Sequence, residues 1–433
     1  MSILMDITSL TVKEMRSKLD KKEISSPELT KAYLERIKNV DGKLESYITV
    51  TEEKAMAAAE AAQAKIDAGE ASPLCGIPLA IKDNICTEDV KTTCASKMLE
   101  NFIPPYNATV MDKLESQDIV MLGKTSMDEF AMGGSTQTSA FKKTKNPYDT
   151  ARVPGGSSGG SAAAVGADLC AAALGSDTGG SIRQPSSFCG VTGLKPTYGR
   201  VSRYGLVAFA SSLDQIGPIA RSAEDCGMIL NAIAGYDPHD GTVSKNPVDD
   251  YTSKIGMSMK GVKIAVPAEF YAEGIDEYGH RSDIVGNYSE LVTASRSEGF
   301  GDEVKRRILL GNYALCSGYY DAYYGKAMAL KQKIREEYAE IFEKCDIILT
   351  PTAPTVAYGA HENISDPKKM YQADICTVTV NIASLPAIST TCGYDDKGMP
   401  IGMSLIGRMW NEAEIIGAAD AFEKSFSRKP ANI

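Results

Sequence analysis

Residues 153–166 read VPGGSSGGSAAAVG, a glycine- and serine-rich segment that runs directly into an apolar one. In most proteins such a cluster marks a flexible linker. Here the chain continues through residues 162–175 as AAAVGADLCAAALG, which predicts a buried helix. A second cluster, GSDTGGSIRQP at 175–185, follows. A helix of this length can return the chain to the same sheet edge, so we expect the two serine clusters to meet in space.

The length, composition and net charge are ordinary for a globular chain. It has 433 residues, 43% of them hydrophobic, and a formal net charge of −10. The acidic balance gives no support for a broad phosphate-binding face. Ten cysteines form no C-x-x-C pair and no cluster with histidine, which favours reduced thiols and no metal site. Without a signal peptide or an apolar run of roughly 18 residues, we expect a cytoplasmic protein with no membrane contact.

The pattern along the chain predicts one large α/β domain. Residues 1–66 read as an N-terminal helical arm, with Ser26 as the N-cap of its second helix. From 67 to 433, short apolar runs alternate with helical stretches, as in a twisted mixed sheet covered by helices on both faces. The runs expected to be strands are GIPLAIK, DIVMLGKT, GVKIAVP, CDIILTPT and LPAISTTCGY. Helical segments are expected at 107–117, 223–235 and 302–345.

Histidine chemistry has little support in this sequence. The chain has three histidines, His239, His280 and His361, all in polar, turn-like contexts where we expect surface residues. This argues against a Ser–His–Asp triad and against a histidine metal site. The chain also lacks G-x-x-x-x-G-K-[ST] and any G-x-G-x-x-G after a strand, so nucleotide binding has no positive support.

A serine nucleophile in this chain needs a base other than histidine. Lys82 ends the apolar run GIPLAIK, where burial would lower the pKa of its ammonium toward neutrality. The alternative is a buried Lys82 paired with Asp83, and these residues alone leave both readings open. Glycines in DTGGS let backbone N–H groups approach a developing negative charge, so that segment can supply an oxyanion hole and a hydroxyl.

Residues 155–190, GGSSGGSAAAVGADLCAAALGSDTGGSIRQPSSFCG, resemble the signature of the amidase signature family, whose members use a Ser–cis-Ser–Lys triad. By this resemblance Ser181 is the nucleophile, Ser157 is the bridging serine after a cis peptide bond, and Lys82 is the base. The resemblance places the oxyanion hole at the backbone N–H groups of Thr178, Gly179, Gly180 and Ser181.

Further segments are similar to one branch of that family, the glutaminase (A) subunits of tRNA-dependent amidotransferases. They include 126–160, 193–222, 298–324 and 348–355. In that branch an arginine holds the α-carboxylate of glutamine and an aspartate holds its α-amino group, which map here to Arg307 and Asp374. A guanidinium for a carboxylate and a carboxylate for an ammonium suit a free amino acid.

The resemblance also implies partners. Ammonia released from glutamine would pass to a B subunit, which uses ATP and Mg²⁺ to convert Glu-tRNA(Gln) to Gln-tRNA(Gln), or Asp-tRNA(Asn) to Asn-tRNA(Asn). A small C subunit would complete a heterotrimer. No cofactor is expected in this chain, and tRNA would bind mainly through the B subunit.

One departure from the branch lies near Asp276 and Glu277. There the glutaminase subunits carry roughly fifty further residues, including a stretch beside the substrate pocket, so this chain is short for its kind. A chain without that segment could be an inactive scaffolding relative, because water exclusion and substrate positioning would suffer. A stand-alone amidase of small amides is a third reading, since it shares the triad but has no need of Arg307 and Asp374.

Overall fold

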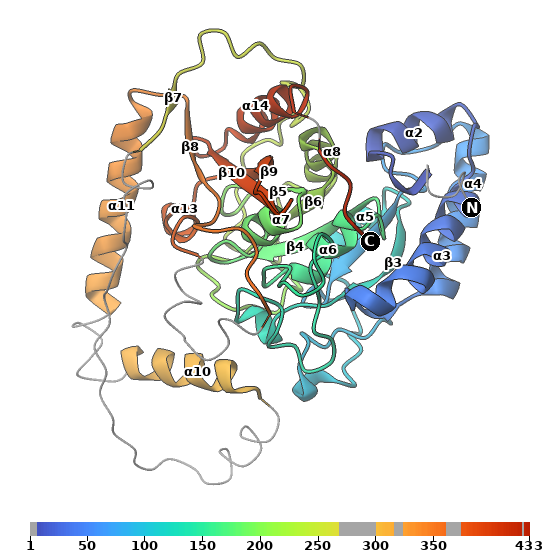
Figure 1. Cartoon of the computed structure of the whole chain (residues 1–433), viewed down its shortest axis with the longest axis horizontal. Helices are drawn as coiled ribbons and strands as arrows, with labels where there is room; N and C mark the ends of the chain where they lie inside the picture. The colour runs from blue at the N-terminus through green and yellow to red at the C-terminus, as the bar shows by residue number, and fades with distance from the viewer. Residues whose placement is uncertain (1–6, 268–299, 316–323, 361–373, 427) are drawn as a thin grey trace.

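The computed structural model describes residues 7–267, 300–315, 324–360, 374–426 and 428–433 (Figure 1). The strands are β1 (Tyr47–Val50), β2 (Pro78–Lys82), β3 (Val120–Thr125), β4 (Ala172–Asp177), β5 (Thr192–Lys195), β6 (Gln215–Ala220), β7 (Ile264–Ala265), β8 (Ile347–Pro351), β9 (Ala387–Tyr394) and β10 (Pro400–Ile406). Each of the five apolar runs expected to be a strand contains one, namely β2, β3, β7, β8 and β9.

The α-helices of the described residues are α2 (Val12–Asp20), α3 (Ser26–Leu44), α4 (Glu52–Ala68), α5 (Thr109–Glu115), α6 (Gly159–Gly166), α7 (Arg183–Phe188), α8 (Ala223–Ile233), α10 (Asp302–Leu315), α11 (Lys326–Phe342), α13 (Val378–Ala383) and α14 (Glu412–Glu423). The helical region predicted at 302–345 contains α10 and α11. Residues 316–323 between them lie outside the described residues.

The strands form one mixed sheet in the order β1-β3-β2-β4-β6-β5-β9-β10-β8-β7. The pairs β2–β3, β2–β4 and β7–β8 are parallel, and the other pairs are antiparallel. This is the mixed α/β architecture that the sequence predicts. β4 lies near the middle of the sheet and is buried along its whole length.

Helices cover both faces of this sheet. On β5, the Thr192 hydroxyl donates to the Glu423 carboxylate of α14 at 2.6 Å. A Cβ added at the next residue, Gly193, would lie 2.2 Å from Ser186 Oγ of α7. Successive strand residues point to opposite faces, so α14 and α7 cover opposite sides. α8 packs with α14, and α6 packs with α7.

The N-terminal helices α2, α3 and α4 lie together at the right of Figure 1. The same part of the chain also contributes β1, an edge strand paired antiparallel with β3, which the prediction did not include. Tyr47 is 2% exposed and its hydroxyl donates to Leu169 O at 3.0 Å. Aromatic and β-branched residues in YITV favour a strand, and this strand attaches the helical arm to the sheet.

The apolar stretch 162–175 is not a single helix, and that prediction was wrong. α6 ends at Gly166, Asp168 adopts a left-handed φ of 59°, and the chain then enters β4. A strand buried on both faces and a buried helix both have continuous apolar runs, so composition did not separate them. The two serine clusters still meet, because one begins α6 and the other follows β4.

The cap of α3 also differs from the prediction. Ser25, rather than Ser26, is the N-cap, and its hydroxyl accepts the Glu28 N–H while the Glu28 carboxylate accepts the Ser25 N–H. This reciprocal pair needs a spacing of three residues, which Ser25 has and Ser26 lacks. Ser26 is buried, and its hydroxyl donates to Gly76 O at 3.3 Å.

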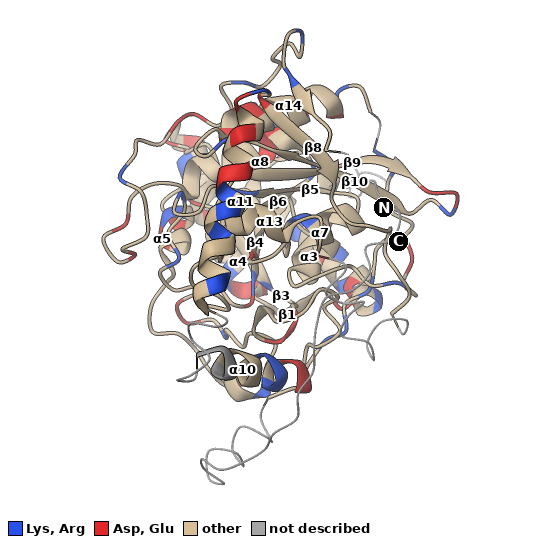
Figure 2. Cartoon of the chain, turned by 90° about the vertical axis from the view of Figure 1, so that its left-hand side faces the viewer, with Lys and Arg blue, Asp and Glu red and all other residues tan. Residues whose placement is uncertain are grey.

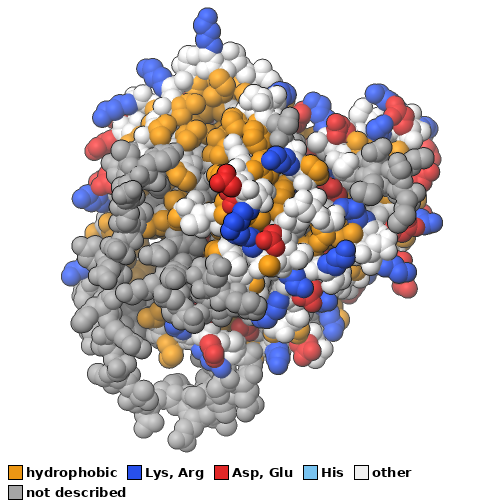
Figure 3. Space-filling view, viewed as in Figure 1, with side chains coloured by type: hydrophobic (Ala, Val, Ile, Leu, Met, Phe, Trp, Pro, Cys, Tyr) orange, Lys and Arg blue, Asp and Glu red, His pale blue; other side chains and the backbone are white. Residues whose placement is uncertain are grey.

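α11 lies along the outside of the sheet, at the left of Figure 1, and Figure 2 shows that both basic and acidic residues occur along it. Tyr338 and Phe342 on its inner side pack on β8 and β10. Next to them lies a groove of about 710 Å³, lined by Arg335, Leu385 and Met409 among others. Figure 3, which views the molecule as in Figure 1, shows hydrophobic side chains gathered on the upper part of the visible surface.

No helix within the described residues is both long and apolar enough to span a membrane.

Replacing Ser25 with alanine should lower the free energy of unfolding by about 1 kcal/mol, because the first turn of α3 loses its side-chain cap. Ser25→Asp should retain most of the stability, since aspartate also caps helices. Urea unfolding followed by circular dichroism would measure both variants. Equal stability of Ser25→Ala and the unchanged protein would contradict this role of Ser25.

Candidate active site

Lys82 ends β2 in the middle of a buried serine cluster. Its Nζ lies 2.7 Å from Ser157 Oγ, 2.8 Å from Ser158 Oγ and 2.9 Å from Ser176 Oγ. The side chain is fully buried, and burial lowers the pKa of Lys82 to about 7, although nearby carboxylates such as Asp128 oppose the shift. A lysine with this pKa is neutral often enough at neutral pH to accept a proton.

Asp83 does not pair with Lys82. Its Oδ2 accepts hydrogen bonds from Thr93 N at 3.0 Å and Thr93 Oγ1 at 2.5 Å, and its Oδ1 lies 3.9 Å from Lys124 Nζ. Neighbouring residues at the end of a strand point to opposite faces, which separates the two side chains. Of the two readings of Lys82 that the sequence left open, the structure therefore shows the lysine among serines.

The segment that carries Ser157 is shaped by close contacts at Gly156. The Gly156–Ser157 peptide bond is cis, as the family resemblance implies. Gly156 N donates to Gln184 Oε1 at 2.9 Å, and Gln184 Nε2 donates to Gly134 O at 3.0 Å. A Cβ at Gly156 would lie 2.1 Å from Asp128 Oδ2, so no other residue fits here without rearrangement.

Ser181 stands between β4 and α7, beside the first serine cluster. Its carbonyl oxygen accepts the Ser158 N–H at 3.1 Å, so the two clusters are in direct contact. Ser181 is 9% exposed, whereas Ser157 is fully buried. Within the described part of the chain, the Ser181 hydroxyl forms no hydrogen bond. It is therefore the more accessible of the two hydroxyls.

The four predicted oxyanion donors differ in whether an acceptor already engages the backbone N–H group. Gly180 N donates to Asp177 Oδ1 at 2.9 Å, so it is already engaged. The N–H groups of Thr178, Gly179 and Ser181 have no acceptor among the residues that the structure describes. Gly180 has a φ of 137°, and a Cβ there would lie 2.2 Å from Thr377 Oγ1. Close packing against Thr377 thus requires glycine at this position.

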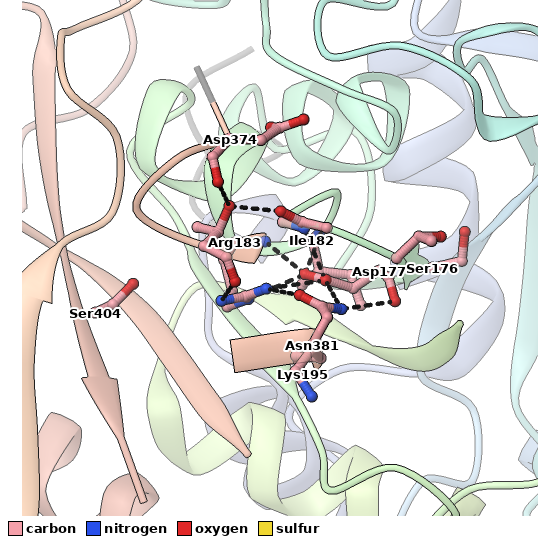
Figure 4. A network of polar contacts seen from close by, with 12 residues as sticks. Ser176, Asp177, Ile182, Arg183, Lys195, Asp374, Asn381 and Ser404 are labelled. Atoms are coloured by element: carbon pink, nitrogen blue, oxygen red, sulfur yellow. Dashed lines mark hydrogen bonds and ion pairs between the residues drawn. The ribbon is translucent and has the colours of Figure 1, made fainter. Parts of the chain in front are cut away.

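A buried ion pair holds the loop in place, as Figure 4 shows. Asp177 accepts hydrogen bonds from Arg183 Nε at 3.1 Å and Nη2 at 3.0 Å, and from Asn381 Nδ2 at 2.8 Å. Burial alone would raise the pKa of Asp177, but the Arg183 charge and these hydrogen bonds outweigh it and hold the pKa well below its usual range. Asp177 is therefore ionised, and it fixes both ends of the loop that contains Ser181.

The structure describes both Arg307 and Asp374, and Figure 4 shows Asp374 near Arg183 and Ile182. Arg307 Nε donates to Glu303 Oε1 at 2.6 Å. Burial raises the pKa of Asp374 to about 7, and the nearby Arg307 charge opposes that shift, so the two side chains are electrostatic neighbours. Thr377 Oγ1 donates to Gly179 O at 2.6 Å, which ties the turn after Asp374 to the loop that contains Ser181.

Sequence reasoning missed three residues around Lys82. The Ser158 hydroxyl donates to Ser176 O at 3.1 Å, and Asn84 Nδ2 donates to Ser176 Oγ at 3.0 Å. Ser158 and Ser176 belong to the two serine clusters, so the clusters themselves pointed to them. Asn84 lies two residues after Lys82, and strand alternation indicates that both face the same side.

The remaining predictions concern residues outside this site. His239 is largely exposed, and its Nδ1 lies 2.9 Å from Asp237 Oδ1. His280, His361 and the expected break near Asp276 and Glu277 lie outside the described residues. Among residues with a described placement, no group of three or more His, Cys, Asp or Glu side chains could hold a metal ion.

A serine–lysine cluster carried on a mixed α/β sheet is typical of amidases. The chain belongs to the amidase family, whose model matches residues 28–282 and 278–416. It is 52% identical to the A subunit of the glutamyl-tRNA(Gln) amidotransferase of Ruminiclostridium cellulolyticum, over 98% of this chain and 99% of that protein.

Two solved structures show the same fold. The A subunit of the glutamyl-tRNA(Gln) amidotransferase of Thermotoga maritima is 40% identical, with a TM-score of 0.77 over 96% of this chain and 95% of that one. The peptide amidase of Stenotrophomonas maltophilia is 26% identical, with a TM-score of 0.78 over 98% of each chain. The fold is therefore shared by amidases of different kinds.

This chain is shorter than the Ruminiclostridium protein. The alignment of the two runs over 480 positions but uses 98% of 433 residues, which is about 424, so about 56 positions face no residue of this chain. The family match is split into two parts that overlap at 278–282.

Replacing Lys82 with methionine should give a stability difference from the unchanged protein that depends on pH. Folded Lys82 loses its proton near pH 7, whereas the unfolded chain keeps it up to the ordinary value of 10.5. The unfolded state thus binds more protons between these values, and the unchanged protein gains stability as pH rises through them. Any increase in the free energy of unfolding of Lys82→Met over that of the unchanged protein should be largest at or below pH 7 and should become smaller toward pH 10.

Urea unfolding of both proteins at several pH values between 6 and 10 would measure this difference. Lys260→Met is the matched control, because Lys260 is exposed and the change should produce no such pH dependence. A constant difference for Lys82→Met across the range would contradict the lowered pKa of Lys82.

Proposed function

We propose that this chain is the glutaminase subunit of a tRNA-dependent amidotransferase, with Ser181 as nucleophile, Ser157 as bridging serine and Lys82 as base. The contact that carries the proposal is the 2.7 Å hydrogen bond between the buried Lys82 Nζ and Ser157 Oγ. The names of relatives about half identical over nearly the whole chain support the choice of reaction.

The proposed chemistry is acyl transfer. Neutral Lys82 accepts the Ser157 proton, Ser157 takes the Ser181 proton, and Ser181 Oγ attacks the side-chain carbonyl carbon of glutamine. The N–H groups of Thr178, Gly179 and Ser181, which have no acceptor among the described residues, stabilise the oxyanion. The proton returns through Ser157 to the leaving nitrogen, and ammonia departs. Water then hydrolyses the glutamyl-Ser181 ester by the same relay.

Arg307 and Asp374 are the proposed holders of the amino acid end of glutamine. Arg307 would bind the α-carboxylate in a bidentate manner, and ionised Asp374 would bind the α-ammonium. Their separation from Ser181 would select a side chain of fixed length, which a small aliphatic amide lacks. Neither role is needed by a stand-alone small-amide amidase.

The proposal includes partners and a location. The glutaminase of such a complex works with further subunits, and we assign ATP, Mg²⁺ and most tRNA contacts to a B subunit, with a C subunit completing a heterotrimer. This chain would need no cofactor of its own. Participation in aminoacyl-tRNA synthesis makes a cytoplasmic location part of the proposal. The acceptor is Glu-tRNA(Gln) or Asp-tRNA(Asn).

We further propose that the chain lacks a segment of its relatives near Asp276 and Glu277. The overlap of the two family matches at 278–282 and the unmatched positions of the Ruminiclostridium alignment support this. Normal glutamine turnover by the 433-residue chain with its B and C partners would exclude an inactive scaffolding protein.

Ser181→Ala should abolish ammonia release from glutamine by the assembled complex, because the acyl-enzyme can no longer form. Ammonium chloride should restore formation of amidated tRNA, since only the ammonia source is lost. Coupled glutamate detection and acid-gel analysis of charged tRNA would measure the two steps. Ser186→Ala is the control, a buried serine of α7 outside the relay. Glutaminase activity retained in Ser181→Ala would refute the proposal.

The pH dependence should separate Lys82 from Asp374. Both groups have a pKa of about 7, and both must be deprotonated in the free enzyme. kcat/KM should therefore rise with a slope above one as pH increases toward 7, and then level off. Asp374→Asn should reduce that slope to about one while lowering kcat/KM. A pH-independent kcat/KM between pH 5.5 and 7 would contradict this assignment.

A further inference from the structure

α10, the helix that carries Arg307, is fixed to the body of the protein at its N-terminal end. Gly301 N donates to Glu129 Oε2 at 2.7 Å. The other oxygen of the buried Glu129 accepts the Ser96 hydroxyl at 2.6 Å. The Phe300 ring meets Phe130 edge to face at 5.5 Å. A carboxylate at a helix N-terminus is stabilised by the helix dipole, so this end of α10 is well anchored.

The guanidinium of Arg307 is held one turn further along α10. It lies 5.1 Å from the ring centre of Phe209, close enough for a cation–π contact. Its Nε donates to Glu303, so a carboxylate and an aromatic ring hold the same group. The Phe209 ring is itself packed against a small buried cluster formed by Ala95, Met127 and Ala131. The orientation of Arg307 therefore depends on where this ring sits.

Asp214 connects Phe209 to the nucleophile loop. The Asp214 side chain is buried, and its carboxylate accepts the N–H groups of Phe209 at 2.9 Å and Ala210 at 3.1 Å. The same carboxylate accepts the Thr178 hydroxyl at 2.6 Å. Thr178 begins the loop that ends at Ser181. The buried Asp214 carboxylate thus fixes the position of the loop that contains Phe209 relative to the loop that contains Ser181.

We propose that Phe209 is a positioning residue for glutamine. It would hold the Arg307 guanidinium in the orientation that binds the α-carboxylate, and so increase the affinity of the site for glutamine. Phe209 acts through Arg307 and takes no part in bond making. The inference rests on the proposed glutaminase function and adds a specificity element to the same site.

The test is the steady-state glutaminase activity of Phe209→Leu in the complex with the partner subunits. KM for glutamine should rise about three- to tenfold, which is the size of a cation–π contact at a partly exposed site, with kcat changed less than about twofold. Phe422→Leu is the matched control, because Phe422 of α14 stacks on Phe426, which follows that helix, and the change should leave KM unchanged. A fall in kcat with unchanged KM would overturn the proposal.

A double-mutant cycle with Arg307→Gln separates positioning from general packing. On that background Phe209→Leu should change kcat/KM by less than about twofold, because the partner of the ring is gone. An equal loss on both backgrounds would overturn the proposal. If the unchanged complex released no ammonia, the glutaminase function would fail. The role of Phe209 would then be tested by the Kd for glutamine of the Ser181→Ala complex with and without Phe209→Leu. An unchanged Kd would overturn that role.

Discussion

The burial of one ammonium group among hydroxyls shapes the centre of this protein. An isolated buried lysine is costly, because water solvates the charged form far better than the protein interior does. The fold lowers that cost by surrounding Lys82 with three serine hydroxyls rather than a carboxylate partner. A carboxylate at hydrogen-bonding distance would stabilise the charged form and raise the pKa of Lys82 again. The exclusion of Asp83 is therefore as important as the presence of Ser157.

The glycines near Lys82 follow from the same requirement. Two serine loops can approach one ammonium group only if their backbones pack without intervening side chains. Gly156 lies against Asp128, and Gly180 lies against Thr377, in places where a Cβ would collide. The Asp177–Arg183 ion pair then fixes the second loop, which contains Ser181. A composition typical of a flexible linker thus belongs to a tightly fixed part of the structure.

The residues proposed to bind the substrate are held differently from those proposed to carry out the chemistry. Lys82, Ser157 and Ser181 lie at the ends of buried central elements, whereas Arg307 stands on an outer helix joined to the body through Glu129 and Phe209. This division fits a family whose solved members include both a component of a tRNA amidotransferase and a peptide amidase on one fold.

Local composition and a long signature were enough to predict the fold class, five of the strands and the candidate catalytic residues. They did not identify β1, β4, β5, β6 or β10. Whether an apolar run becomes a helix or a central strand depends on neighbours far along the chain, and 162–175 offered no period to choose between them. The packed fold was needed to show that Lys82 turns from Asp83 toward the serines, and that the Gly180 N–H is engaged by Asp177. It also revealed Asp214 as the link between Phe209 and Thr178. The Asp214–Thr178 contact spans 36 positions, and a contact of that range forms only because the sheet brings the two loops together.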